Sequence, residues 1–386
     1  MSLTINVLFS LTFLVLFAGI AILAASLRKS TRLWWILAVG LAALVVLSVL
    51  MEGTLKVILL DVAALLAVAM VWDTGTPEAK RAARNYFWLL IIALVSIAAA
   101  LLLGGEQSLA PGAPLEKTIA ILLLVGFALK LALVPFYFWL PAVAQTAPPL
   151  TTALIVALVD MGSFQELYNI RSAAPWVFTD FLPFWLALAL LSMFGGAILA
   201  IAQKDIKRML AFSTIDDLGY LVLGILGSQT GMSGALFGAL SHSVMKVILF
   251  GAVAVAESKL GHSLTMKDRG LAAFFPVSAA AFIVGAFGMI GIPPTLGFVG
   301  RWRLYLSGMQ QGGIVLVLAM AVATGLALIY YVRAIHQVWL GPPDQAIVAK
   351  GAIIKEPLAA VTVLVVLCVL VIGLGFYPGL WTGILP

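Results

Sequence analysis

Two cations stand inside long apolar segments that prolines interrupt. Lys130 lies in "GFALKLALVPFYFWLP", ahead of Pro135, and Arg301 follows Pro293 and Pro294 in "GIPPTLGFVGRW". A charge near mid-bilayer costs about 2.5–3.5 kcal/mol, so each cation needs a partner or water. A buried lysine can release its proton, whereas arginine stays protonated. Lys130 is therefore a candidate proton carrier, with a structural role against freed backbone carbonyls as the alternative; Arg301 fits a static charge better than a carrier.

Further titratable side chains occur in the same apolar surroundings. Asp61, Asp216 and Asp217 are acids within predicted spans, and His242 and Lys246 stand four residues apart, on one face of a helix. Each is therefore a titratable group that needs a partner or water within the membrane. The alternatives are a structural counter-charge at Asp61, a hydrogen-bonded core histidine at His242, and a wet position at the cytoplasmic end for the paired acids.

Composition places these residues in lipid. Of 386 residues, 63% are hydrophobic and 10% charged, with a mean hydropathy of +1.16, whereas soluble domains carry about 25% charged residues. One cysteine, Cys368, excludes a disulfide framework and a four-cysteine metal or iron–sulfur site. We expect no cofactor, no metal and no catalytic residue. The net charge of +6 is interpreted as membrane topology, so no nucleic-acid partner is expected.

Apolar runs long enough to cross a bilayer recur along the whole chain. They predict an all-α polytopic membrane protein with about 12 transmembrane helices, the tenth too long for one straight helix. The first is predicted to be a retained helix rather than a signal peptide. The limits are 5–27, 33–51, 54–72, 85–104, 117–140, 149–170, 178–201, 206–228, 231–256, 271–309, 313–336 and 357–380.

Basic residues alternate between the predicted loops. Cytoplasmic loops collect Lys and Arg, so the alternation places both termini on the outer or lumenal face. Fifteen of the 22 basic residues fall in alternate loops. They are Arg28, Lys29, Arg32, Lys80, Arg81, Arg84, Lys204, Lys207, Arg208, Lys259, Lys267, Arg269, Arg333, Lys350 and Lys355.

The two proline-interrupted helices predict inverted repeats, a pattern typical of transporters. Spans two to six and seven to eleven form two five-helix units, with the interrupted helix fourth in each. An odd number of helices makes the units opposite in orientation. The predicted divisions are an N-terminal helix (1–32), a first repeat (33–171), a second repeat (172–340) and a C-terminal helix (341–386).

Four ordered motifs carry a family resemblance: "GFALKLALVPFYFWLP", "AQKDIKRMLAFSTIDDLGYLVLG", "SHSVMKVILFGAV" and "GIPPTLGFVGRW". They resemble the antiporter-like membrane subunits shared by respiratory complex I (NADH-quinone oxidoreductase), membrane-bound hydrogenases and Mrp-type sodium/proton antiporters, over roughly residues 55–333. The resemblance implies a 14-helix fold, no redox cofactor and a central line of ionisable residues. With 12 predicted spans, two N-terminal helices and the long lateral C-terminal helix of one family member are expected to be missing.

The resemblance also assigns residues. Asp61 stands where the family has a glutamate that pairs with the broken-helix lysine, here Lys130. Tyr137 stands where a histidine is usual, and Asp160 where a buried lysine is usual. The change at Asp160 reverses the sign of a charge, so this acid is expected to accept protons, to hold Lys130 charged, or to make only a structural ion pair.

Three other positions match the second half of the family pattern. His242 and Lys246 match its His/Lys helix, and Arg301 occupies the exit position that is Lys or Glu in the family. The implied mechanism is an electrostatic relay, in which a charge shift near Asp61 releases the Lys130 proton through water wires.

The resulting functional prediction is a proton-translocating, non-redox membrane subunit of a complex I-like or hydrogenase-type pump, of the NAD(P)H-quinone oxidoreductase type of translocase. One alternative is a subunit of a cation/proton antiporter or inorganic-carbon uptake complex; another is a non-conducting structural relative. Expected partners are other membrane subunits, membrane lipid and protons, with sodium as the alternative ion. The expected location is an inner (plasma) or thylakoid membrane.

Overall fold

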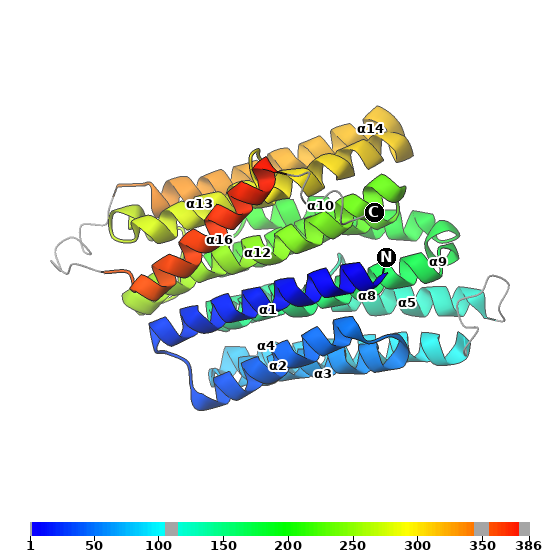
Figure 1. Cartoon of the computed structure of the whole chain (residues 1–386), viewed down its shortest axis with the longest axis horizontal. Helices are drawn as coiled ribbons and strands as arrows, with labels where there is room; N and C mark the ends of the chain where they lie inside the picture. Colours follow the sequence, from blue (N-terminus) through cyan, green and yellow to red (C-terminus); the bar gives the residue numbers. More distant parts are fainter. Residues whose placement is uncertain (1, 105–114, 343–354, 378–386) are drawn as a thin grey trace.

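The computed structural model describes residues 2–104, 115–342 and 355–377, whose helices lie mostly side by side along the longest axis of the molecule (Figure 1). Within these residues the secondary structure is helical, apart from an isolated β-bridge between Asp205 and Thr265. A bilayer core offers no water to backbone groups, and helices satisfy those groups internally. The predicted all-α membrane fold is confirmed.

The helices follow the chain in a regular up-and-down order (Figure 1). The first half contains α1 (Ser2–Leu27), α2 (Arg32–Leu50), α3 (Gly53–Trp72), α4 (Pro77–Gly104), α5 (Glu116–Lys130), α6 (Trp139–Thr146), α7 (Pro149–Leu154), the π-helical turn η1 (Ile155–Val159) and α8 (Asp160–Ala173). The second contains α9 (Trp176–Thr179), α10 (Leu182–Ile201), α11 (Ile206–Ile225), α12 (Gln229–Leu260), η2 (Leu271–Ala273), α13 (Pro276–Ile290), α14 (Leu296–Ala334), η3 (Ile335–Trp339) and α16 (Leu358–Phe376).

Nine helical stretches in the described residues are long and apolar enough to cross a membrane. Three further crossings bring the bundle to the predicted number of about twelve. The first is α11, which is charged and 20 residues long, and the second is formed by α5 and α6 together. The third is formed by α13 and the first part of α14, because α14 turns back at Gly313, whose φ is 60°. The first part of α14 continues α13, so the long tenth span is an interrupted helix, as predicted.

The first interruption separates α5 from α6 directly after Lys130. Protein groups satisfy the backbone atoms that it frees: Trp139 Nε1 donates to the Leu129 carbonyl at 3.1 Å, and the Val134 amide donates to Ser192 Oγ at 2.9 Å. Pro135 lies inside the break, whereas Pro141 is the third residue of α6 and leaves that helix intact. These two backbone atoms are therefore satisfied by protein side chains, as a bilayer requires.

The second interruption lies between α13 and α14. Gly291 ends α13 with a φ of 84°, in the left-handed region that favours glycine. At Gly297 a Cβ atom would lie 1.9 Å from the Gly288 carbonyl oxygen, so only glycine permits this approach of the two helices. The chain runs along α13–α14 in the direction opposite to α5–α6 (Figure 1), as inverted repeats require. The residue limits predicted for the repeats stay a prediction.

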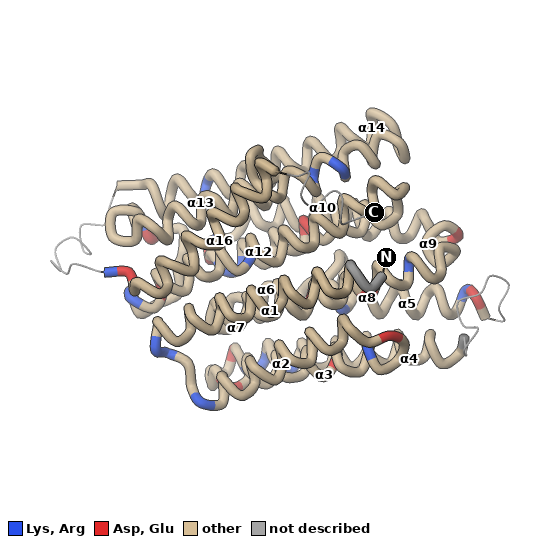
Figure 2. The backbone as a smooth tube through the Cα atoms, in the orientation of Figure 1, with Lys and Arg blue, Asp and Glu red and all other residues tan. Residues whose placement is uncertain are grey.

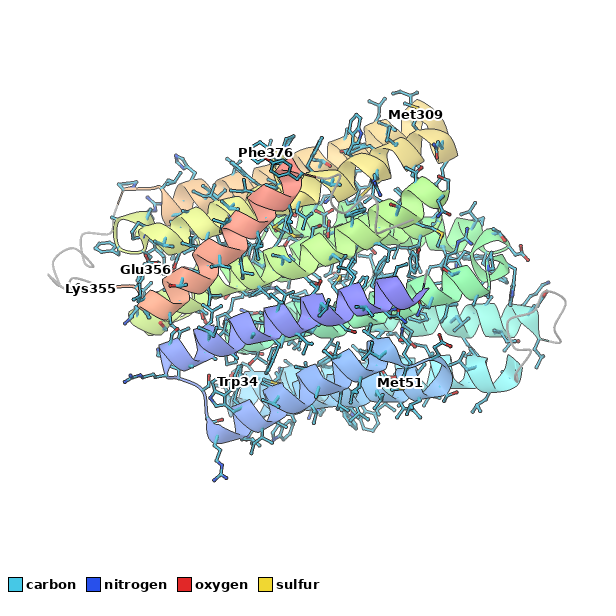
Figure 3. All side chains as sticks on the ribbon, viewed as in Figure 1. Trp34, Met51, Met309, Lys355, Glu356 and Phe376 are labelled. Atoms are coloured by element: carbon cyan, nitrogen blue, oxygen red, sulfur yellow. The ribbon has the colours of Figure 1, made fainter. Side chains whose placement is uncertain are left out.

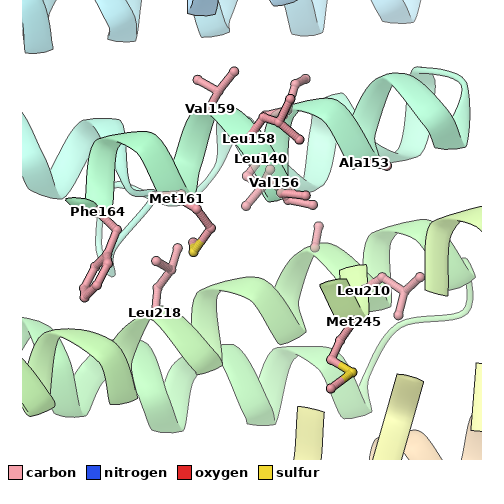
Figure 4. Close-up of a cluster of buried hydrophobic side chains, with 14 of the residues drawn as sticks. Leu140, Ala153, Val156, Leu158, Val159, Met161, Phe164, Leu210, Leu218 and Met245 are labelled. Atoms are coloured by element: carbon pink, nitrogen blue, oxygen red, sulfur yellow. The ribbon is translucent and has the colours of Figure 1, made fainter. Parts of the chain in front are cut away.

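The span formed by α7, η1 and α8 lies in the centre of the molecule and is buried along its length. Figure 4 shows Val156, Met161 and Phe164 of this span in a cluster with Leu218 of α11 and with Met245. Ser243 Oγ of α12 donates to the Ala157 carbonyl in the π-turn at 2.8 Å. The apolar core therefore holds the π-turn immediately before Asp160.

The predicted basic loops meet at one end of the bundle, and Figure 2 shows Lys and Arg where α1 joins α2 and where α16 begins. The Ile206 amide donates to the Leu264 carbonyl at 3.0 Å, and that of Met266 to the Lys204 carbonyl at 2.8 Å. These bonds join the loop before α11 to the loop after α12. Lys350 lies outside the described residues.

The C-terminal helix α16 packs across α1, α12, α13 and α14. Figure 3 labels Lys355 and Glu356 just before this helix and Phe376 at its end. The Glu356 carboxylate accepts the amides of Val277 and Ser278, at 3.1 and 2.8 Å, at the N-terminus of α13. An anion there stabilises a helix, so the C-terminal segment also positions the second interrupted helix.

Candidate functional site

Lys130, the last residue of α5, lies at the junction of three helices. Its side chain is 1% exposed, and Nζ lies 2.9 Å from Asp61 Oδ1 of α3 and 3.1 Å from Glu166 Oε2 of α8. We call Asp61, Lys130 and Glu166 the Lys130 cluster. The predicted proximity of Asp61 and Lys130 is confirmed, and the contact is a direct ion pair.

Glu166 was not predicted as a site residue. Its Oε2 accepts a hydrogen bond from Lys130, while Oε1 is buried without a hydrogen-bond partner in the described part of the chain. The available signal was a second carboxylate in the predicted span 149–170, six residues after Asp160. The sequence does not show that Glu166 faces Lys130, because that depends on how α5 and α8 pack.

Lys56 is a second buried cation that was not singled out, because it stands at the start of a predicted span, where a lysine is ordinary. It is 4% exposed. Its ammonium donates to the side-chain oxygen of Gln165, whose amide nitrogen donates to Asn6 Oδ1 at 2.6 Å. Lys56 is therefore joined to α8 directly beside Glu166.

In the second half of the chain, Asp217 joins two of the predicted residues. Its Oδ2 lies 2.7 Å from His242 Nδ1, and its Oδ1 lies 2.7 Å from Arg301 Nη2. We call Asp217, His242 and Arg301 the Asp217 cluster. His242 Nε2 is buried and has no partner among the residues that the structure describes. The Asp217 cluster therefore leaves one ring nitrogen of His242 unsatisfied by described residues.

Arg301 is held by more than its ion pair. Its Nη2 also donates to the Met289 carbonyl at 2.9 Å, and the guanidinium lies 3.7 Å from the centroid of the Tyr220 ring. An arginine with these contacts has a fixed position, and it does not deprotonate. The geometry agrees with a static charge at the interrupted helix.

Lys246 has neutral hydrogen-bond partners. Its Nζ donates to the Leu210 carbonyl at 2.8 Å and to Ser213 Oγ at 2.6 Å, and the Tyr331 hydroxyl donates to the same Oγ at 3.1 Å. No carboxylate in the described residues lies within ion-pair distance of Lys246. Its proton is therefore held by weaker electrostatic attraction than that of Lys130.

The paired acids of α11 are buried, with Asp216 3% and Asp217 8% exposed. Asp216 Oδ2 accepts from the Tyr330 hydroxyl at 2.9 Å, while Oδ1 is buried without a partner among the described side chains. The interpretation that these acids are wet at the cytoplasmic end is wrong. The reason is tertiary: the last turns of α14 cover α11, which sequence spacing cannot show.

Asp160 follows the π-turn and is 1% exposed. Its Oδ2 has no hydrogen-bond partner in the described ranges, and the charge of Lys246 acts on it. Tyr86 of α4 was also missed; its buried hydroxyl is unpartnered in the same ranges, and the charges of Asp160 and Asp61 both act on it. Its ring stacks on Trp139 at 4.1 Å. No hydrogen bond between described residues joins the Tyr86 hydroxyl to either acid.

Tyr137 lies apart from these groups. It is half-buried in the break between α5 and α6, where its ring contacts Phe138 and Phe212, each with ring centroids 5.7 Å apart. No hydrogen bond between described residues joins its hydroxyl to either cluster. The structure therefore does not bring Tyr137 together with the other predicted site residues.

Interrupted helices around a buried line of ionisable side chains define a class of polytopic membrane proteins. The chain belongs to the NADH:quinone oxidoreductase/Mrp antiporter transmembrane family, whose pattern matches residues 86–327. NADH-quinone oxidoreductase subunit N 2 of Syntrophobacter fumaroxidans is 32% identical over 280 residues, 72% of this chain and 58% of that protein. The chain spans about half the length of the curated relatives it matches. The family predicted from the four motifs is confirmed.

Solved structures show the same fold. A chain of the Mrp complex from Dietzia sp. DQ12-45-1b matches with a TM-score of 0.87 at 20% identity, covering 99% of this chain and 82% of that one. A chain of respiratory complex I from Thermus thermophilus matches with a TM-score of 0.86 at 23% identity, covering 98% and 82%. At these identities the likeness concerns the fold alone.

Proposed function

We propose that the chain is a proton-translocating, antiporter-like membrane subunit of a complex I-like or hydrogenase-type redox pump. The observation that carries the proposal is the Lys130 ammonium, buried at a helix break between two carboxylates. An intramembrane ionisable group of this kind marks an ion or proton pathway by default. Family membership supports the same function.

In the proposed relay, the charge balance of the Lys130 cluster controls the position of its proton. A partner subunit that shifts charge near Asp61 changes the attraction that holds the Lys130 proton. The proton then passes through water and Tyr86 towards Asp160 and on to Lys246. Lys246 is a suitable acceptor because its partners, the Leu210 carbonyl and Ser213, are neutral.

The proposal gives the Asp217 cluster an electrostatic role. Arg301 holds Asp217 charged, and Asp217 orients His242 through Nδ1. His242 Nε2 is the atom through which this cluster takes part in transfer, while Arg301 remains protonated. The second half of the chain thus differs from the family pattern, because Arg301, which stays protonated, occupies the exit position that is lysine or glutamate in the family.

The proposed setting follows from the same resemblance. The partners are other membrane subunits of a multisubunit complex, surrounding lipid, and protons, with sodium as the alternative ion. The membrane is a cell inner (plasma) or thylakoid membrane, with both termini on the outer or lumenal face. The basic loops gathered at one end support this orientation, since such loops remain cytoplasmic.

The decisive test is proton transfer by the parent complex, purified and reconstituted in vesicles. Lys130→Met keeps side-chain length and removes the charge, so transfer should fall by about 10²-fold or more, within the range for loss of an acid–base group. Lys117→Met is the matched control, because Lys117 is an exposed lysine at the start of the same helix. Assembly should survive both changes.

The same assay separates the alternatives. Unchanged proton transfer in an assembled Lys130→Met complex would show that the chain is a non-conducting structural relative. Transfer that requires sodium on the opposite side, and no redox substrate, would favour a cation/proton antiporter subunit. Proton movement that depends on inorganic-carbon uptake would favour a subunit of an inorganic-carbon uptake complex.

A further inference from the structure

A cavity of about 560 Å³ lies at the basic end of the bundle, where α1, α3 and α12 end and α2 begins (Figure 1). Four membrane-spanning helices reach their ends around it, so it lies at the depth of the lipid headgroups. Among the described residues that line it, none belongs to the Lys130 cluster or to the Asp217 cluster. The cavity is therefore separate from the proposed proton pathway.

The lining of this cavity is amphipathic. The part that comes from α1, α2, α3 and α7 is apolar and includes the buried side chains of Ala24, Trp34, Met70 and Leu150. The part that follows α1 and α3 is polar and consists of Lys29, Ser30, Thr31, Asp73 and Thr74. The apolar side chains thus lie towards the membrane, and the polar side chains lie towards the end of the bundle.

Two charged side chains of the polar part lack an ion-pair partner. Lys29 and Asp73 pair neither with each other nor with another described residue. Asp73 Oδ2 accepts the Thr31 hydroxyl at 3.3 Å. The Thr74 hydroxyl oxygen is buried and has no hydrogen-bond partner among the described residues. The cavity thus offers one positive charge, one negative charge and a free hydroxyl.

The other charged groups of the lining already have partners. Glu257 Oε1 accepts the Leu264 amide at 2.9 Å, and its Oε2 lies 3.6 Å from Lys207 Nζ. His262 Nε2 lies 3.6 Å from Asp268 Oδ1. The two unpaired charges, on Lys29 and Asp73, cancel. A ligand with a single charge would leave one of them unpaired, whereas a zwitterion with both charges pairs both.

We propose that this cavity binds the headgroup of a phospholipid that carries a primary ammonium and a phosphate, as phosphatidylethanolamine does. The ammonium donates to the Asp73 carboxylate, and the phosphate accepts from Lys29 and from the Thr74 hydroxyl. The glycerol backbone contacts the apolar lining. The acyl chains follow the lipid-facing surfaces of α1 and α2, where Ile22 and Ile36 are 47% and 60% exposed. This site does not depend on proton translocation.

Zero-length cross-linking tests the contact with Asp73. The full chain, in detergent micelles that contain phosphatidylethanolamine, is treated with a water-soluble carbodiimide, which joins a primary amine to a carboxylate as an amide. We expect peptide mass spectrometry to find the lipid adduct on Asp73. Asp180 is the matched control: it is exposed, it accepts a threonine hydroxyl, from Thr179 at 3.0 Å, and it precedes α10, at the end opposite the basic loops. No adduct on Asp73, or equal yields at the two acids, would overturn the proposal.

Thermal unfolding in detergent distinguishes the ligand chemistries. Phosphatidylethanolamine should raise the Tm of the chain, because a ligand that binds the folded state stabilises it. Phosphatidylglycerol, which lacks the ammonium, should raise the Tm less at the same concentration. Free phosphoethanolamine has the same charges without acyl chains, and it should also raise the Tm less. An equal shift with phosphatidylglycerol would contradict the zwitterionic headgroup, and an equal shift with free phosphoethanolamine would show that the ligand is soluble rather than a lipid.

Variants connect this shift to the cavity. Asp73→Asn and Lys29→Gln should each weaken phosphatidylethanolamine binding about tenfold, as expected for the loss of a hydrogen bond to a charged group. Both side chains are exposed, so folding should be preserved. Asp180→Asn and Lys204→Gln, at exposed residues outside the cavity lining, are the controls and should bind as wild type does. Unchanged binding in both cavity variants would overturn the assignment of the headgroup to this cavity.

Discussion

Lys130 and Lys246 differ in the groups around their ammonium nitrogens. Lys130 has two carboxylates within 3.1 Å, whereas Lys246 donates to a carbonyl and a hydroxyl. Removing both carboxylate charges leaves the buried ammonium uncompensated, which is far more costly than losing one of two partners. The shared ammonium therefore makes the two acids of the Lys130 cluster energetically interdependent.

A double-mutant cycle measures this interdependence. Asp61→Asn and Glu166→Gln each leave Lys130 one carboxylate, so each alone should destabilise the protein only modestly. The double variant should lose about 3–5 kcal/mol of unfolding free energy, more than the sum of the single losses. Thermal or denaturant unfolding in detergent gives the three values. Additive losses, within about 0.5 kcal/mol, would show that the acids act separately.

Tyr86 tests the connection from Asp61 to Asp160. Tyr86→Phe removes the buried hydroxyl and keeps the ring that stacks on Trp139, so folding should be preserved. Proton transfer by the reconstituted complex should fall by about tenfold or more, because a step of the relay loses its titratable group. Tyr377→Phe, at a tyrosine that is 68% exposed, is the control. Equal rates in both variants would exclude Tyr86 from the pathway.

Arg301→Lys tests the static charge. Lysine keeps the positive charge but loses the planar group that stacks on Tyr220 while bonding Asp217 and the Met289 carbonyl. This substitution is not conservative at a stacked, hydrogen-bonded site. We expect a loss of about 1–3 kcal/mol in unfolding free energy and proton transfer within about twofold of wild type. A large loss of transfer at normal stability would make Arg301 part of the relay itself.

The two interrupted helices place one cation each, and they do so by different local means. In α5–α6 the freed backbone is bonded by Trp139 and Ser192. In α13–α14 the break depends on Gly291 and on close packing at Gly297. The second break thus adds close packing at glycine to side-chain hydrogen bonds, since Arg301 and Thr295 donate to the Met289 and Ile292 carbonyls.

Gly297→Ala tests the second break. Its Cβ would lie 1.9 Å from the Gly288 carbonyl oxygen, so α13 and α14 must separate, and we expect a loss of about 1–3 kcal/mol or more in unfolding free energy. Gly325→Ala is the matched control in the same helix, because no atom of a neighbouring residue lies within 4 Å of the point that its Cβ would occupy; it should be neutral or stabilising by up to about 1 kcal/mol. Equal effects of the two substitutions would show that the close approach is not required.

The whole molecule has two different ends. The loops with the predicted alternating lysines and arginines meet at one end, where Asp205 pairs with Thr265. A cavity lined by Lys56 and Glu166 lies towards the other end. The two ends therefore differ in charge.

Labelling of single cysteines tests the proposed orientation. Lys204→Cys, at an exposed residue of the basic end, should be labelled only from the cytoplasmic side in a Cys368→Ser background. Lys117→Cys, at an exposed lysine of the opposite end, should be labelled only from outside. Lys207 is unsuitable, because it is 3% exposed and its ammonium donates to the Ala147 carbonyl at 3.0 Å. Reversed accessibility at both positions would invert the topology.

Sequence alone was sufficient for the helical crossings and the family, and the family resemblance assigned the Asp61–Lys130 pair. A bilayer forces apolar segments into helices of nearly fixed length, and prolines mark where such helices break. A cation in the membrane demands a counter-charge. These constraints depend on short stretches of sequence or on the surrounding bilayer, so they can be recognised from the sequence without knowing how the helices pack.

Only the tertiary structure decided the other partners of the buried cations and acids. Glu166 joins Lys130 across 36 residues, and Asp217 joins Arg301 across 84. Tyr330 covers Asp216 across 114 residues, which makes a seemingly wet acid a buried one. A membrane-spanning helix is apolar on every face, so any face can pack against a neighbouring helix. The hydrophobic pattern therefore does not determine the rotation of the helix about its axis. Rotation and packing, which the pattern leaves open, determine these partners.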